Sequence, residues 1–221
     1  MADLTLVVGN KNYSSWSLRP WLAMRQAGIP FDEVRIALYQ PGSKARLLQY
    51  SPAGKVPVLI DGPVTVWDSL AILEYLADKF PQCRLWPEDR AARAHARTIS
   101  AEMHAGFARL REHMSMNLRR SLPGRGRTPE VDAEIGRITR MWLDCLGRYG
   151  GPFLFGAFGA ADAMYAPVAG RFTTYGVALP PPCQRYVGAL LALPALQEWY
   201  AAARAEAEVL PQFEPESASA G

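Results

Sequence analysis

The stretch Gly54–Leu76 constrains the fold of this chain more than any other. Two short apolar runs, Val58–Ile60 and Val64–Trp67, flank an Asp61-Gly62 pair, and this pattern predicts a β-hairpin. Leucines then recur at helical spacing, which predicts a helix directly after the second strand. The stretch is therefore expected to form a strand–strand–helix unit.

Two features of this unit indicate a ligand. Asp68 and Ser69 lie where the second strand leads into the helix, and free backbone N–H groups there can hold a carboxylate. Pro57 begins a strand without an N–H to donate, and a cis Val56-Pro57 bond would turn the backbone of Val56 outward. An extended peptide could then pair with Val56 as an added strand. The alternative is an ordinary hairpin followed by a surface helix.

Composition excludes several classes of function. The chain has 221 residues, of which 49% are hydrophobic and 20% are charged, and its net charge is +3. So small an excess of positive charge does not indicate a nucleic-acid or anionic-membrane partner. The sequence shows no run long enough to span a membrane and no signal-peptide pattern at its N-terminus. We expect a cytoplasmic protein.

Cysteines and histidines are few and widely spaced. The cysteines occur in no Cys-x-x-Cys or other metal-ligand spacing, and we expect reduced thiols at Cys83, Cys145 and Cys183. The histidines recur every nine residues, so successive rings would face opposite sides of a helix at His95, His104 and His113. These spacings predict no metal site.

The chain changes character near Pro81. Residues 1–80 read as strand, helix, strand, short helix, strand, strand, helix, which predicts one sheet with helices on both faces. Residues 81–88 read as a linker, residues 89–213 as a helical domain, and the small polar residues 214–221 as a disordered tail. Within the helical domain the periodicity predicts four helices, over 90–118, 129–148, 162–175 and 194–208.

Three motifs together resemble the cytosolic glutathione transferases, in particular the zeta and theta classes that carry serine in the active-site turn. They are Ser14-Ser15-Trp16-Ser17-Leu18-Arg19-Pro20, Ser51-Pro52-x-Gly54-Lys55-Val56-Pro57-Val58-Leu59 and Asp68-Ser69-x-Ala71-Ile72-x-Glu74-Tyr75-Leu76. The resemblance covers nearly the whole chain. It implies a thioredoxin-like N-terminal domain, an all-helical C-terminal domain and a homodimer. Gly159 replaces the Ser or Thr that usually caps the family's buried helix, and we expect that turn to survive.

The resemblance also implies where glutathione, the co-substrate, would lie. Val56 would pair through its main chain with the cysteinyl part, directly before a cis Pro57. Asp68 and Ser69 would hold the γ-glutamyl ammonium and carboxylate. Lys55 would lie near the glycyl end.

The chemistry requires a thiolate at neutral pH. A free thiol has a pKa of about 8.5, and a hydroxyl donor together with a helix N-terminus can lower it by roughly two units. The turn after the first strand offers such hydroxyls, and we favour Ser15 over Ser14 as the catalytic residue, with Tyr13 as a further alternative. These serines would otherwise serve only as helix caps.

The expected activity is addition of the glutathione thiolate to small electrophiles. The alternatives are a glutathione-dependent isomerase of the maleylacetoacetate type and a non-catalytic binding protein with the same fold. A thiol reductase is disfavoured, because the turn contains no cysteine. Residues that either line a second-substrate pocket or belong to the core are Tyr13, Trp16, Met103, Phe107, Tyr165 and Arg171.

Overall fold

The computed structural model describes residues 3–214. Its N-terminal half contains four strands in the order β2-β1-β3-β4, with β2 parallel to β1 and the other pairs antiparallel. The elements are β1 (Leu4–Val8), α1 (Ser15–Gln26), β2 (Asp32–Arg35), α2 (Ser43–Leu48), β3 (Val58–Asp61), β4 (Val64–Trp67) and α3 (Ser69–Lys79). The predicted hairpin and the helix that follows it are confirmed.

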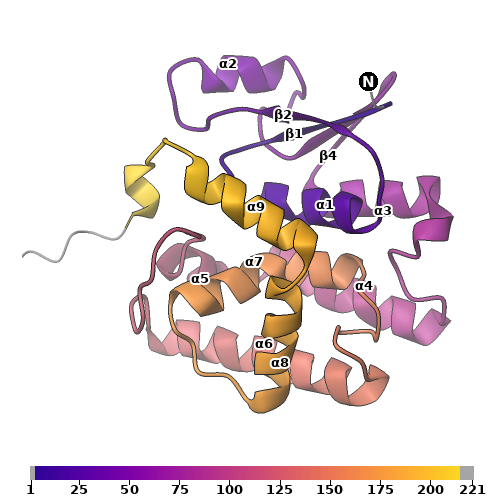
Figure 1. Ribbon diagram of the computed structural model, residues 1–221, viewed down its shortest axis with the longest axis vertical. Coiled ribbons are helices and arrows are strands. Elements are labelled where there is room, and N and C mark those ends of the chain that lie inside the picture. Colours follow the sequence, from indigo (N-terminus) through magenta and orange to yellow (C-terminus); the bar gives the residue numbers. More distant parts are fainter. Residues whose placement is uncertain (1–2, 215–221) are drawn as a thin grey trace, which may run out of the picture.

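The alternation of side chains along β1 divides the core between the two faces of the sheet. Leu6 and Val8 face α1 and α3 as part of the main hydrophobic core. Val7 points the other way and packs with Val58 of β3 and Leu47 of α2. Figure 1 shows α2 above the sheet and α1 with α3 below it, between the sheet and the helical half. The helix α1 therefore lies at the centre of the molecule.

The C-terminal half is helical. It consists of α4 (Arg90–Ala105), α5 (Ala108–His113), α6 (Pro129–Tyr149), α7 (Ala160–Thr174), α8 (Pro181–Leu191) and α9 (Pro194–Ala205), with the 3-10 turns η1 (Pro81–Cys83) and η2 (Pro211–Phe213). Nearly all of α7 is buried, because other helices surround it. The expected fold class, a thioredoxin-like domain followed by a helical domain, is confirmed, whereas the limits 1–80 and 89–213 remain a prediction.

The single helix expected over 90–118 is wrong, because the helix breaks at Gly106 and Phe107. Phe107 adopts a left-handed conformation with φ of 58°. The carbonyl groups freed at the end of α4 accept hydrogen bonds from Arg111, whose Nη2 lies 2.6 Å from the carbonyl oxygen of Gly106 and also contacts that of Met103. A side chain from the next helix thus ends α4, and helical periodicity does not reveal such a contact.

The helix α8 was not predicted, because the proline run 180–182 appeared to separate two helices. Pro181 and Pro182 instead occupy the first turn of α8, where a missing N–H breaks no helical hydrogen bond. The buried face of α8 includes Cys183, Tyr186 and Leu190.

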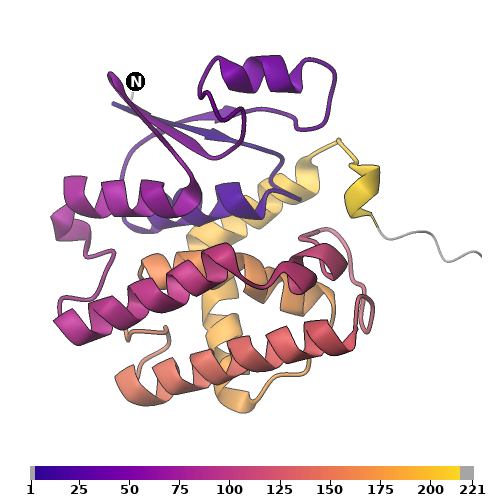
Figure 2. The ribbon, with the colours of Figure 1, turned by 180° about the vertical axis from the view of Figure 1, so that it is seen from behind.

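The segment that follows α9, up to residue 214, lies against the N-terminal half, as Figure 2 shows. Glu214 was expected to begin a disordered tail, but its carboxylate accepts hydrogen bonds from Tyr13, Asn117 and Arg120. The remainder of that predicted tail, 215–221, lies outside the described residues. Between residues 3 and 214, no helix combines the length and apolarity that crossing a membrane would require.

Candidate functional site

The N-terminus of α1 presents an organised pair of hydroxyls. Ser14 is the N-cap residue, and its Oγ accepts a bond from the backbone N–H of Ser17 at 3.4 Å. The Oγ of Ser17 is fully buried, accepts the backbone N–H of Gly9 at 3.1 Å and lies 2.8 Å from Ser14 Oγ. In this structure Ser14 Oγ donates to Ser17 Oγ. Both hydroxyls can donate and accept, so the bond can reverse, with Ser17 donating to Ser14 and the proton of Ser14 turning to a ligand.

The other two hydroxyls of this turn have different partners. Tyr13 donates to Glu214 Oε1 at 2.5 Å and accepts from Arg119 Nη2 at 2.7 Å, so its hydroxyl is already engaged. The Oγ of Ser15 lies 3.5 Å from Nη2 of Arg171, toward the interior of the helical half. Of the three candidates, Ser14 has the hydroxyl whose proton a reversal of the bond to Ser17 would release to a ligand.

The loop before β3 has the expected backbone geometry. The Val56-Pro57 peptide bond is cis, which confirms that expectation. Pro57 is buried, Val56 is half-buried, and Lys55 is exposed. Lys44 of α2 donates to the carbonyl oxygen of Gly54 at 3.2 Å and so fixes the loop from the side of α2.

The start of α3, like the start of α1, is capped by a side chain and carries a buried serine. Asp68 is the N-cap residue with φ of 78°, and its Oδ1 accepts the N–H of Leu70 at 2.9 Å. Its Oδ2 lies 3.4 Å from Nε2 of His104, and its side chain is 44% exposed, so a cationic ligand can still reach it. Ser69 is fully buried, and its Oγ accepts a bond from Arg19 Nη1 at 3.4 Å.

Sequence reasoning did not assign a role to Arg19, which connects the two helix N-termini. Arg19 belongs to α1, is 1% exposed, and reaches Ser69 at the start of α3. Its guanidinium group lies 4.3 Å from the centre of the Trp16 ring, and that of Arg111 lies 5.0 Å from the same ring. The one indication in the sequence that Arg19 belongs to the site was its position one helical turn after Ser15.

Three guanidinium groups make this interior electropositive. Burial, together with the charges of Arg111 and Arg171, lowers the pKa of Arg19 to about 9. Burial, followed by the charge of Arg111, likewise lowers the pKa of Arg171 to about 10. A carboxylate bound beside these groups would relieve their mutual repulsion. The region around Ser15 and Ser69 therefore favours an anionic ligand.

The residues expected to line a second-substrate pocket do not form one group. Tyr165 is fully buried and donates its hydroxyl to the carbonyl oxygen of Ile99 at 3.0 Å, so it belongs to the core and not to an open pocket. Met103 and Phe107 also pack within the main core. The helix α4, which carries Met103, packs against the buried helix α7, and Phe107 lies in the break between α4 and α5. Of the six expected residues only Trp16 is half-buried.

The thiols do not offer a nucleophile at this site. The three cysteines, all of which the structure describes, are free and lie outside the turn before α1. Burial raises the pKa of Cys145 to about 12 and also raises the pKa of Cys183. A reaction at this site would therefore need a thiol supplied by a ligand.

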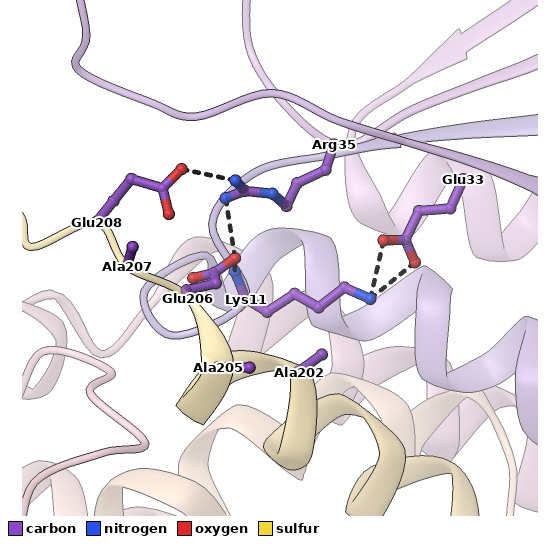
Figure 3. Close-up of a pocket in the computed structure, with 8 residues that line it drawn as sticks. All are labelled: Lys11, Glu33, Arg35, Ala202, Ala205, Glu206, Ala207 and Glu208. Atoms are coloured by element: carbon purple, nitrogen blue, oxygen red, sulfur yellow. Dashed lines mark hydrogen bonds and ion pairs between the residues drawn. The ribbon is translucent and has the colours of Figure 1, made fainter.

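A separate hollow of about 560 Å³ lies where the end of α9 meets β2 (Figure 3). Its cations are already paired: Lys11 Nζ lies 2.8 Å from Glu33, and Arg35 lies 3.1 Å from Glu206 and 2.6 Å from Glu208. The backbone N–H of Lys11 also donates to Glu206 at 2.6 Å. These bonds hold residues 206–208 against the N-terminal half.

Glu214 makes the last of these attachments, and replacing it should lower the free energy of unfolding measurably. Burial raises its pKa, but hydrogen bonds from Tyr13, Arg120 and Asn117 outweigh burial and lower the pKa overall. The stability that Glu214 contributes is therefore present above its ordinary pKa and is lost as the pH falls through the lowered value. We expect Glu214→Gln to lower the free energy of unfolding by about 2 kcal/mol at pH 7. Urea unfolding should show that difference shrinking below about pH 4, and a difference independent of pH would contradict the assignment.

The fold and this site define a class of protein in which a thioredoxin-like domain is joined to a helical domain. Residues 13–79 match the glutathione S-transferase N-terminal domain family, and residues 90–202 match the glutathione S-transferase C-terminal domain family. The chain belongs to the glutathione S-transferase family.

Individual relatives agree with this membership. A probable maleylacetoacetate isomerase of Caenorhabditis elegans is 37% identical over 94 residues, which is 42% of each protein, so the match spans under half of that relative. Glutathione S-transferase Z2 of Arabidopsis thaliana is 28% identical over 63% of this chain and 67% of the relative. A glutathione transferase homologue from Burkholderia, solved with bound glutathione, has 25% identity and a TM-score of 0.69 over 92% of this chain and 99% of that one.

Proposed function

We propose that this protein is a glutathione transferase that activates the glutathione thiol for attack on small electrophiles. The observation that carries the proposal is the convergence of three elements. The Ser14 hydroxyl begins α1, the cis Val56-Pro57 bond precedes β3, and Ser69 at the start of α3 bonds to Arg19 of α1. A tripeptide that carries a thiol, an ammonium and two carboxylates has a complementary partner for each group.

Each part of glutathione has a proposed contact. The exposed carboxylate of Asp68 would take the γ-glutamyl ammonium, and Ser69 beside Arg19 would take the γ-glutamyl carboxylate. The backbone of Val56 would pair with the cysteinyl residue as an added strand. Lys55 is exposed at the edge of the loop and can approach the glycyl carboxylate.

Ser14 is the residue that we propose as donor to the thiolate. The sequence favoured Ser15, but the Oγ of Ser15 lies toward Arg171, whereas Ser14 caps the helix and can receive the proton of Ser17. A hydroxyl proton and the positive end of the helix dipole both favour the ionised sulfur. The thiolate then attacks the electrophile, and the leaving group departs with its bonding electron pair.

Calorimetry and turnover tests would separate binding from catalysis. We expect glutathione to bind the full-length chain and to react with a halonitrobenzene at neutral pH. Ser69→Ala should weaken glutathione binding by about tenfold, because it removes a buried hydroxyl that a carboxylate would share with Arg19. Ser121→Ala, at an exposed serine in the loop before α6, should leave binding unchanged. Absence of glutathione binding to the parent protein would refute the proposal.

An isomerase of the maleylacetoacetate type is the second candidate. The named relatives include probable maleylacetoacetate isomerases of Caenorhabditis elegans and Vibrio cholerae. The buried guanidinium group of Arg171 could hold a carboxylate of such a substrate, while Arg19 holds glutathione. Turnover of maleylacetone without net consumption of glutathione would identify this activity. Binding of glutathione with neither activity would instead indicate a non-catalytic protein.

We also propose a homodimer in the cytoplasm. Val64 and Trp67 of β4 are 41% and 46% exposed, and an apolar edge strand is a surface that a second copy could cover. The free state of all three cysteines is compatible with a reducing compartment. Light scattering coupled to size exclusion would give the mass of the assembly in solution.

A further inference from the structure

Away from the glutathione site, the side of the helical half where α4 lies beside α6 brings three metal-ligating side chains together. His95 belongs to α4, and Asp144 and Cys145 belong to α6. One ligand atom from each lies within 4.8 Å of the other two. His95 Nε2 is 3.9 Å from Asp144 Oδ2 and 4.0 Å from Cys145 Sγ. The cluster combines imidazole, carboxylate and thiol donors.

These separations approach those of a bound ion. A tetrahedral metal with bonds of about 2.0–2.3 Å holds its nitrogen, oxygen and sulfur donors roughly 3.3–3.6 Å apart. The donors of Asp144 and Cys145 therefore each need to approach that of His95 by about half an ångström. The donors of Asp144 and Cys145 lie within 4.8 Å of each other and need to approach by up to about 1.3 Å. The side chain of Asp144 is 61% exposed, so it can rotate without disturbing the core.

The surrounding contacts fix the two helices and the histidine ring. An ion pair at 2.7 Å between Arg137 and Glu102 ties α6 to α4 several turns from the cluster. His95 Nδ1 lies 3.0 Å from the hydroxyl of Tyr149, and its ring meets that of Phe155 edge-on at 5.6 Å. With Nδ1 engaged, Nε2 is the nitrogen that faces Cys145 and Asp144. Metal-binding histidines are oriented by a polar partner on the second nitrogen in this way.

Solvent reaches the cluster through the side chains of His95 and Asp144. Cys145 is fully buried, whereas the side chain of His95 is 23% exposed, so an ion would enter past His95 and Asp144. The charges that act on Cys145 are those of Asp144, Asp162 and Arg148. Two carboxylates and one guanidinium leave the surroundings net negative, which favours a divalent cation.

We propose that His95, Asp144 and Cys145 form a binding site for a thiophilic divalent cation of the zinc type. On binding, Cys145 loses its thiol proton to water and a sulfur–metal bond forms, with no change in oxidation state. Three protein ligands leave a fourth position for water. The site shares no residue with the proposed glutathione site, and either one can exist without the other.

Cobalt(II) provides the direct test on the full-length protein after treatment with a chelator. One equivalent of cobalt should produce the thiolate-to-cobalt charge-transfer band in the near ultraviolet, and zinc should abolish that band. Cys145→Ser should remove the band, and Asp144→Asn should weaken cobalt binding at least tenfold. Tyr149→Phe should weaken binding by roughly 10- to 100-fold through the orientation of His95.

Matched variants make the outcome decisive. Cys83→Ser and Cys183→Ser, at the other two free thiols, should keep the band and its affinity. No band with the parent protein, or a band that persists in Cys145→Ser, would overturn the proposal. Asp144 is exposed and its replacement should not affect folding, so an unchanged affinity in Asp144→Asn would overturn the proposal even if Cys145→Ser does not fold.

Discussion

Replacing Ser14 by alanine is expected to lower kcat/KM at pH 6.5 by about 5- to 50-fold, because the bound thiol would lose its hydroxyl donor. With the donor, a pKa near 6.5 would leave about half of the bound glutathione ionised. Without it, the pKa would lie between about 7.5 and 8.5, according to the share of the shift that the helix N-terminus supplies, and about 1–9% would be ionised. At pH 9 both proteins would hold mostly thiolate, and the two rates should nearly converge. A pH profile of kcat/KM and the ultraviolet absorbance of the bound thiolate would both report this shift.

Neighbouring serines provide the controls for this prediction. Ser17→Ala keeps the Ser14 hydroxyl but removes the group that orients it, so we expect a smaller rise in the pKa of the bound thiol. Ser15→Ala should change turnover less than Ser14→Ala, because its Oγ lies toward Arg171. If Ser14→Ala and Ser15→Ala in combination leave turnover unchanged, neither serine activates the thiol.

Local signals in the sequence were sufficient to predict the elements that carry the proposed site. The Asp61-Gly62 turn, the alternating strands around it and the Asp68 cap act over a few residues, so the hairpin and the start of α3 could be predicted. The turn at Gly159 also forms as expected, since Asp162 accepts the backbone N–H groups of Gly159 and Leu154. In these places local chemistry and tertiary packing favour the same structure.

Contacts between distant residues could not be predicted in this way. The break after α4 depends on Arg111, whose guanidinium group reaches back to carbonyl groups of the preceding helix. The bond from Arg19 to Ser69 and the approach of His95 to Cys145 each join residues 50 positions apart. The expectation of no metal site rested on spacing along the chain, and spacing does not describe two helices that lie side by side.

Asp162 is expected to be a costly polar residue to remove from the helical half. It is fully buried, and its carboxylate accepts the N–H of Leu154 at 3.1 Å and that of Gly159 at 2.9 Å. Asp162→Ala would leave both backbone groups buried without a partner. The loss of free energy of unfolding should be about 3–4 kcal/mol, measured by urea unfolding at pH 7.

A comparison of the stability of Asp162→Asn with that of the parent protein at two pH values tests the charge state of the same carboxylate. Burial raises the pKa of Asp162 to about 6, although the N–H bonds from Leu154 and Gly159 lower it in part. Because that value exceeds the ordinary pKa of 3.8, ionisation disfavours the folded state, and the stability contributed by this group decreases as the pH rises. Between pH 4.5 and 7 the parent protein should lose about 2 kcal/mol relative to Asp162→Asn, which carries no charge at this position. The destabilisation caused by asparagine should therefore be larger at pH 4.5 than at pH 7, and the reverse order would show that the buried carboxylate is stabilised in its ionised form.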